Sequence, residues 1–175
     1  MTTIKFILVF FTLLTLSVVL CGCSKQSEVI ESDTLAADWQ QLSKEAEPAW
    51  ASRDVEKILN LYSDDCVWED LAIGKVMSGK EEIRSFLNEW FAAFPDNTLE
   101  TTSSITSGHF QCAEWINRGT HNGDFLNIPA TGKTVSIRGA SIIELRKGKI
   151  IRSTDYYDMA SLLRQLGISS LPPQQ

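Results

Sequence analysis

Hydrophobic and polar residues alternate through most of the second half of the chain. The stretch from Val135 to Leu145 shows this most plainly, because every second residue in it, counted from Val135, would lie on one face of a strand and most of these residues are apolar. Residues 110–121 alternate in the same way, and residues 98–106 are rich in threonine, serine and isoleucine. Residues 150–157 follow a Lys-Gly pair at 147–148, which is typical of a tight hairpin turn. The pattern predicts a meander of long antiparallel strands.

The first half of the chain has the three- and four-residue spacing of amphipathic helices. Apolar residues recur in this way from Leu35 to Trp50, and Pro48 is expected to kink or break that helix. A second helix is expected to begin with Asp54 as its cap and to place apolar side chains on one face as far as Tyr62. These positions predict helices packed through one apolar face each.

The clearest helix begins at Ser78, which together with Glu81 fits a capping box, and it ends at a proline. Residues 66–70 before it are expected to form a short strand. A last short helix is predicted between Asp158 as its N-cap and Gly167 as its C-cap. Helices first and strands behind predict a single α+β domain, in which a curved antiparallel sheet wraps round the N-terminal helices. Such a sheet leaves a conical pocket at its open end, where small ligands commonly bind.

The chain starts with an apolar run from Phe6 to Leu20, behind one lysine. The run is shorter than the roughly 20 residues that a spanning helix needs, so residues 1–22 are interpreted as a signal peptide. The junction Leu-Cys-Gly-Cys that ends at Cys23 resembles the bacterial lipobox, which predicts that Cys23 is acylated. A signal peptide cleaved elsewhere and an uncleaved anchor are the alternatives.

Cleavage before Cys23 would leave a polar tether at 23–32, a domain at 33–168 and a tail at 169–175. The protein is then expected to be exported and held to the bacterial cell envelope by its acyl chains. The Ser24 that follows Cys23 predicts the outer membrane, on its periplasmic side, if the source is Gram-negative.

Composition narrows the classes of partner. The 175 residues include 16 Lys+Arg and 22 Asp+Glu, and a net charge of −6 argues against a nucleic-acid partner. Two histidines and the absence of a CxxC motif argue against a structural zinc site. Cys66 and Cys112 are interpreted as separate small core residues, with a disulfide as the alternative in an oxidising compartment.

Two segments carry a specific resemblance to a known family. They are residues 115–133 (WINRGTHNGDFLNIPATGK) and residues 148–167 (GKIIRSTDYYDMASLLRQLG), with weaker likeness around 62–68 and 94–96 and in the helix after Ser78. In this order and spacing they resemble the SnoaL-like polyketide cyclases, also called ester cyclases, of the nuclear transport factor 2-like superfamily.

The resemblance covers roughly residues 35–167 and implies a cone-shaped α+β fold and a reaction without metal or cofactor. In the cyclases, an aspartate on the last strand is the general acid/base of an intramolecular aldol reaction, and the matching residue is Asp155. Burial in an apolar cone would raise its pKa toward the operating pH. Asp155 could instead be a structural carboxylate paired with Arg138 or Arg152, and Asp158 fits a helix cap better than a second catalytic acid.

Aromatic and small residues complete the predicted pocket. The residues expected to contact substrate are Tyr62, Trp68, Trp90, Trp115, Gly139 and Ser141. Gly139 and Ser141 stand where the cyclases carry Gln and His, so this wall is smaller and less polar. A developing enolate needs a hydrogen-bond donor, and His121 and Tyr62 are the candidates, which makes His121 the second candidate catalytic residue. His121 could also simply end a strand and bond a carbonyl.

Two classes of function remain open. The first is a membrane-tethered, cofactor-free cyclase or isomerase-type enzyme (isomerase or lyase class) in which Asp155 transfers protons on a small apolar enolisable carbonyl compound. The second is a non-catalytic small-molecule-binding or accessory envelope lipoprotein, which Gly139 and Ser141 favour. A homodimer through the outer face of the sheet is compatible with either.

Overall fold

The structure is a computed structural model, and it describes residues 33–169. The predicted signal peptide, Cys23 and the tether at 23–32 lie outside the described residues, as do residues 170–175 of the tail. Those assignments stay predictions.

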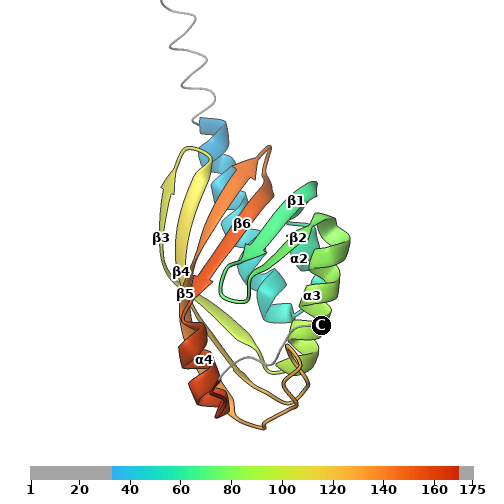
Figure 1. Cartoon of the computed structure of the whole chain (residues 1–175). Helices are drawn as coiled ribbons and strands as arrows, with labels where there is room; N and C mark the ends of the chain where they lie inside the picture. The colour runs from blue at the N-terminus through green and yellow to red at the C-terminus, as the bar shows by residue number, and fades with distance from the viewer. Residues whose placement is uncertain (1–32, 170–175) are drawn as a thin grey trace, which may run out of the picture.

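A curved six-stranded sheet forms the body of the domain (Figure 1). Its strands, in spatial order, are β2 (Lys75–Ser78), β1 (Tyr62–Asp70), β6 (Lys149–Tyr157), β5 (Thr134–Arg146), β4 (Phe110–Thr120) and β3 (Thr98–Ser107). Every neighbouring pair is antiparallel except β1 and β6, which run parallel. β6 is therefore a central strand with a partner on each side.

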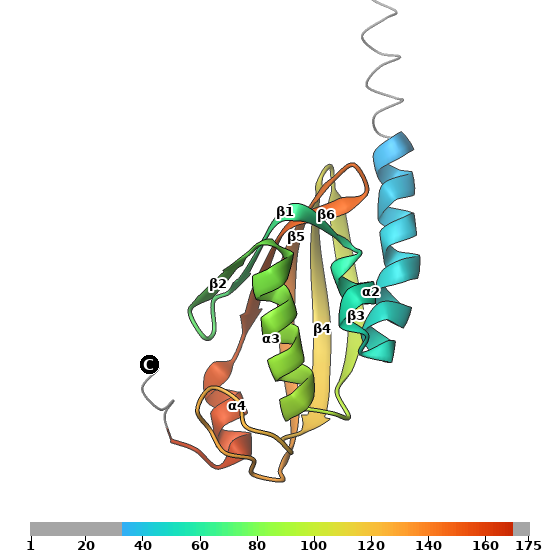
Figure 2. The same ribbon diagram turned by 90° about the vertical axis from the view of Figure 1, so that its right-hand side faces the viewer.

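Helices pack against one face and one end of this sheet. They are the helical residues 33–52, α2 (Val55–Leu59), α3 (Gly79–Ala93) and α4 (Met159–Leu166). Figure 2 shows helix 33–52, α2 and α3 on the same side of the sheet, with α4 beyond its end. The predicted α+β fold is confirmed. Within residues 33–169, no helix combines the length and apolar character needed to cross a membrane.

The alternating pattern of the sequence is the pattern of the sheet. Val135, Ile137 and Leu145 are buried against the helices, as their spacing predicts. The turn between β5 and β6 has positive φ at both Lys147 (51°) and Gly148 (70°), which is the type I′ geometry that favours a hairpin. Irregular register in β3–β4 and β5–β6 adds local twist and helps to curve the sheet around the core.

The first helix does not break at Pro48, contrary to the sequence-based expectation. It is helical from residue 33 to residue 52 and ends before Arg53, which has a φ of 53°. A proline inside a helix removes one hydrogen bond at a cost of about 3 kcal/mol. Burial of Trp39 and Leu42 on one face offsets this cost, and the Trp39 Nε1–H donates to the Gly108 carbonyl at 3.0 Å.

Three boundaries between residues 54 and 82 differ from those predicted. α2 ends at Leu59, and Tyr62 begins strand β1, which is longer than the predicted strand at 66–70. Strand β2 was not predicted, because its four residues carry too short a pattern. Ser78 is the N-cap of α3, but the acid that reaches back to its N–H is Glu82 (2.8 Å) and not Glu81.

The shift in the capping box has a backbone cause. Gly79 has a φ of +77°, outside the helical region, so the regular turn starts one residue later than the Ser78 motif indicates. Glu81 instead pairs with Arg84. The final helix agrees with its prediction, since Asp158 accepts from the Ser161 N–H at 3.0 Å and Gly167 closes it with a φ of 78°.

Candidate active site

The concave face of the sheet and the helices enclose a cavity of about 550 Å³. Seven aromatic side chains among the described residues line it: Trp50, Tyr62, Trp68, Phe86, Trp90, Trp115 and Tyr157. The rings also pack on one another, as where Tyr62 stacks on Trp68 with centroids 6.1 Å apart. A ligand in this cavity would therefore contact several aromatic side chains.

Asp155 lies on the cavity wall in β6. Its neighbour in β5 is Ser141 and its neighbour in β1 is Asp70. The Ser141 hydroxyl donates to Oδ1 at 2.6 Å, and the Trp68 Nε1–H donates to Oδ2 at 3.0 Å. Two donors from two different strands therefore hold the carboxylate in one orientation.

Trp115 extends this chain of hydrogen bonds. Its Nε1–H donates to the Ser141 Oγ at 2.8 Å, which directs the hydroxyl proton of Ser141 to Asp155. The indole ring can lie there because its cross-strand neighbour is Gly139. A Cβ atom on Gly139 would overlap the ring and would lie 2.7 Å from the Tyr156 carbonyl oxygen. Gly139 therefore makes room for Trp115.

The environment of Asp155 raises its pKa to about 6. Burial is the main cause, because it disfavours the charged form. The hydrogen bond from Ser141 opposes the shift, the negative charge of Asp70 adds to it, and the bond from Trp68 opposes it. A carboxyl group with this pKa accepts a proton near neutral pH and releases it again, which is what general acid/base catalysis requires.

Two further polar residues on the wall, Asp70 and Tyr157, were not among the predicted site residues. The Tyr157 hydroxyl donates to Oδ2 of Asp70 at 3.1 Å, and Oδ1 accepts the N–H groups of Ala72 and Ile73. Burial raises the pKa of Asp70 above its ordinary value. Aspartate is disfavoured within strands, so the presence of Asp70 in β1 is a sequence signal that could have marked it as a candidate site residue.

The structure brings most of the predicted site residues together on the cavity wall: Tyr62, Trp68, Trp90, Trp115, Ser141 and Asp155. Gly139 lies beneath Trp115 and is not part of the wall. Asp155 does not pair with Arg152, which binds Glu144 at 3.3 Å, and Arg138 is an exposed residue of β5.

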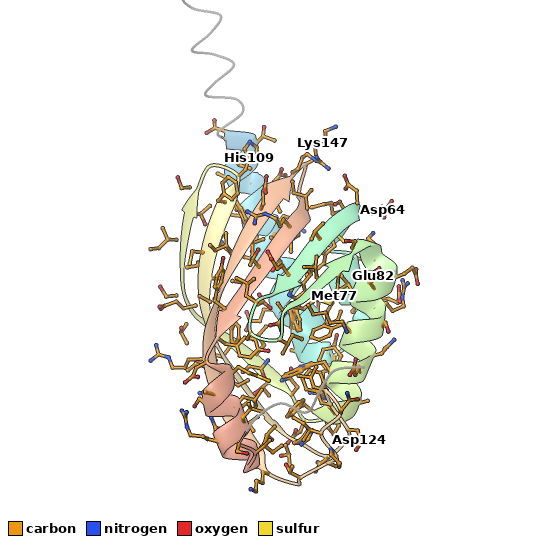
Figure 3. The ribbon with its side chains drawn as sticks, viewed as in Figure 1. Asp64, Met77, Glu82, His109, Asp124 and Lys147 are labelled. Atoms are coloured by element: carbon orange, nitrogen blue, oxygen red, sulfur yellow. The ribbon has the colours of Figure 1, made fainter. Side chains whose placement is uncertain are left out.

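His121 is not at the cavity. It follows β4, is fully buried, and stacks on Phe94 with ring centroids 5.1 Å apart. Its Nδ1 accepts the Thr131 N–H at 3.3 Å, so in the neutral ring the proton is on Nε2, which has no partner. In Figure 3 the labelled Asp124, three residues on, marks this end of the domain, opposite the hairpin tips at His109 and Lys147. We assign His121 to the packing of the loop at 121–133.

The burial of His121 predicts that the free energy of unfolding falls at acid pH. Desolvation lowers the pKa of His121, so as the pH falls below about 6.5 the unfolded chain takes up the proton first. The free energy of unfolding should then drop more in wild type than in His121→Asn, whose Oδ1 can still accept from Thr131. Urea unfolding at pH 7.5 and 5.0 measures both drops, and equal drops would contradict the prediction.

Cys66 and Cys112 are both free, with Cys66 buried as predicted and Cys112 exposed, contrary to the expectation of a core residue. Across residues 33–169, no group of His, Cys, Asp and Glu side chains is arranged to hold a metal ion.

Comparison with solved structures finds the same fold in bacterial proteins. A protein from Catenulispora acidiphila with a ketosteroid isomerase-like fold, in complex with trimethylamine, has a TM-score of 0.66 and 22 % identity, covering 75 % of this chain and 97 % of that one. AclR from Streptomyces galilaeus, a candidate hydroxylase, has a TM-score of 0.66 and 26 % identity, covering 76 % and 97 %. A candidate SnoaL-like polyketide cyclase from Jannaschia sp. CCS1 has a TM-score of 0.68 and 16 % identity, covering 78 % and 94 %.

No sequence among curated proteins matches the chain. The sequence profile of the SnoaL-like polyketide cyclases, in contrast, matches residues 40–166, which run from the first helix through the cavity-lining strands to the end of α4. Because this match spans most of the described domain, the chain belongs to the SnoaL-like polyketide cyclase family.

Proposed function

We propose that this protein is a cofactor-free enzyme of the cyclase or isomerase type, in which Asp155 moves a proton on a small, largely apolar, enolisable carbonyl compound. The observation that carries the proposal is the state of Asp155. It is a carboxyl group with a pKa of about 6, oriented by Ser141 and Trp68, on the wall of an aromatic cavity large enough for a small molecule.

The proposed chemistry starts with the Asp155 carboxylate, which takes the acidic proton on the carbon next to the carbonyl. The substrate becomes an enolate and Asp155 becomes a carboxylic acid. In a cyclisation, the enolate carbon attacks a second carbonyl of the same molecule, and the new alkoxide takes the proton back from Asp155. In an isomerisation, the proton returns to a different carbon. Each route leaves Asp155 as it began and needs no added reagent.

Tyr62 is suited to stabilise the enolate oxygen. Burial, with the nearby charge of Asp155 and of Cys66, raises the pKa of its hydroxyl well above the ordinary value, so it stays protonated and able to donate. It lies on the same cavity wall as Asp155. A donor aimed at the developing charge is the usual partner of a carboxylate base in this chemistry.

The experiment is exchange of the α-proton in heavy water. The protein is incubated with a panel of keto-esters, diketones and ketosteroids, and loss of the α-proton signal is followed by NMR. Asp155 must be ionised to act as a base, so the exchange rate at low substrate concentration should rise with pH and level off above about pH 6.

A profile that is flat or falls over this range would contradict Asp155 as the base. Saturable binding of the same compounds without any exchange would favour the second function, a non-catalytic binding protein. The membrane anchor at Cys23 stays a prediction of the sequence.

A further inference from the structure

The wall of the cavity is acidic and contains no positive charge. Asp155 and Asp70 are Cα partners in the parallel pair β1–β6, and both line the cavity, as do Glu47 and Glu100. Among the described lining residues there is no Lys, Arg or His. Glu47 and Glu100 are exposed, and Glu100 pairs with Arg118 at 2.8 Å, so the less exposed negative charge of the wall is that of the two neighbouring aspartates.

Proton transfer on a neutral substrate does not require the negative charge of the second aspartate. One carboxylate is enough to remove a proton, and a second buried one beside it raises the cost of ionising the first. The partners of Asp70 are the Tyr157 hydroxyl and two backbone N–H groups, all neutral. Lys75, the cross-strand neighbour of Asp70 in β2, lowers the pKa of Asp70 through its charge, but its ammonium lies over the Phe86 ring, 5.1 Å from the centroid.

The remainder of the wall suits a cation as well. Seven aromatic rings line the cavity, among them four tryptophans, whose faces attract positive charge more strongly than those of tyrosine or phenylalanine. Carboxylates and π-faces act in the same direction on a cation, because both present negative potential. A neutral apolar ligand would use the rings, leave Asp155 without a counter-charge and leave Asp70 with only the partial compensation that Lys75 gives it.

We propose that the ligand of this cavity carries a positive charge, an amino or quaternary ammonium group held between Asp70, Asp155 and the aromatic wall. The substrate class that follows is a carbonyl compound with a cationic amine. Only the carbonyl half of this class rests on the proposed function, because binding of the cation depends on the wall and not on proton transfer.

The test compares two small molecules of the same shape. Choline and 3,3-dimethylbutan-1-ol differ in having a quaternary nitrogen or a carbon at the branch point. Each is titrated into the full chain at pH 8, and dissociation constants are read from the fluorescence of the cavity tryptophans. Choline should bind about tenfold more tightly or better, the scale of a desolvated cation–π contact. Equal affinity, or tighter binding of the alcohol, would overturn the proposal.

The variant Asp70→Asn tests whether the tighter binding of choline depends on the charge of Asp70. The asparagine side chain keeps an oxygen that can accept from the N–H groups of Ala72 and Ile73, so the turn after β1 is retained, while the charge is removed. The advantage of choline should shrink severalfold and the affinity for the alcohol should not change. Glu69→Gln is the matched control, since it removes the same charge one residue away on the opposite face of β1, outside the cavity. If Glu69→Gln weakened the preference for choline as much as Asp70→Asn does, the preference would come from long-range electrostatic attraction and not from a site in the cavity. That result would also overturn the proposal.

The outcome is independent of catalysis, because choline has no exchangeable α-proton. Choline preference without α-proton exchange would leave the cationic site standing and the enzyme proposal in error. Exchange of neutral ketones without a preference for choline would leave the enzyme proposal standing and the cationic site in error.

Discussion

Replacing Asp155 by asparagine should lower the α-proton exchange rate by about 10²–10⁴-fold, the contribution typical of a positioned acid/base group. Asparagine has the same shape, and its oxygen can still accept from Trp68 while its amide can donate to Ser141. The fold should therefore persist and only the proton transfer should be lost. Exchange by NMR and thermal unfolding by circular dichroism, on the same samples, measure the two effects.

Asp158→Asn provides the matched control for this change. Asp158 is exposed, caps α4 and does not line the cavity. Asparagine is as good an N-cap as aspartate, so this variant should exchange substrate at the rate of wild type. Comparable exchange by Asp155→Asn and wild type, or an equal loss in both variants, would remove Asp155 from the role of base.

The sheet was predictable because local pattern decides it. Strands β4 and β5 follow from the alternation of residues 110–121 and 135–145, β3 follows from the composition of residues 98–106, and β6 follows from the turn signal at Lys147 and Gly148. The parallel pairing of β1 with β6 was not predictable, since it joins segments far apart in the chain and leaves no trace in either of them. The short strand β2 pairs with β1 across a local turn, and it was missed because its four residues carry too short a pattern.

The candidate site could likewise be predicted only where local pattern decides it. Alternation predicts that Ser141 and its neighbours at every second position share the inner face, and burial of a strand aspartate predicts a raised pKa for Asp155. What the sequence could not supply is which residues meet across strands. The cross-strand pairing of Asp155 with Asp70, the hydrogen bond from Trp68 and the burial of His121 against Phe94 all depend on it.

The cross-strand contact between Gly139 and Trp115 supports the hydrogen bonds to Asp155. Gly139→Ala should therefore change both the stability of the fold and the pKa of Asp155. The new Cβ would overlap the Trp115 ring and the Tyr156 carbonyl, and overpacking of this kind costs about 1–3 kcal/mol in the free energy of unfolding. Displacement of the ring would also remove the donor to Ser141 Oγ. Urea unfolding measures the loss of stability.

The chemical consequence has a definite sign. The Ser141 hydroxyl lowers the pKa of Asp155, and Trp115 keeps that hydroxyl in place. Without Trp115 in position, the pKa of Asp155 should rise above about 6, and the midpoint of the exchange profile should move to higher pH. Trp115→Phe should move the midpoint in the same direction, because phenylalanine has no N–H to donate.

Combining the two changes separates packing from hydrogen bonding. Phenylalanine lacks the outer indole ring that the Cβ of residue 139 would strike. The double variant Gly139→Ala, Trp115→Phe should therefore lose less free energy of unfolding than the two single variants lose together. Its pH midpoint should stay raised, since no donor to Ser141 returns. Additive losses of stability would show that Trp115 does not depend on Gly139. An unshifted midpoint in all three variants would show that Trp115 and Ser141 do not tune Asp155.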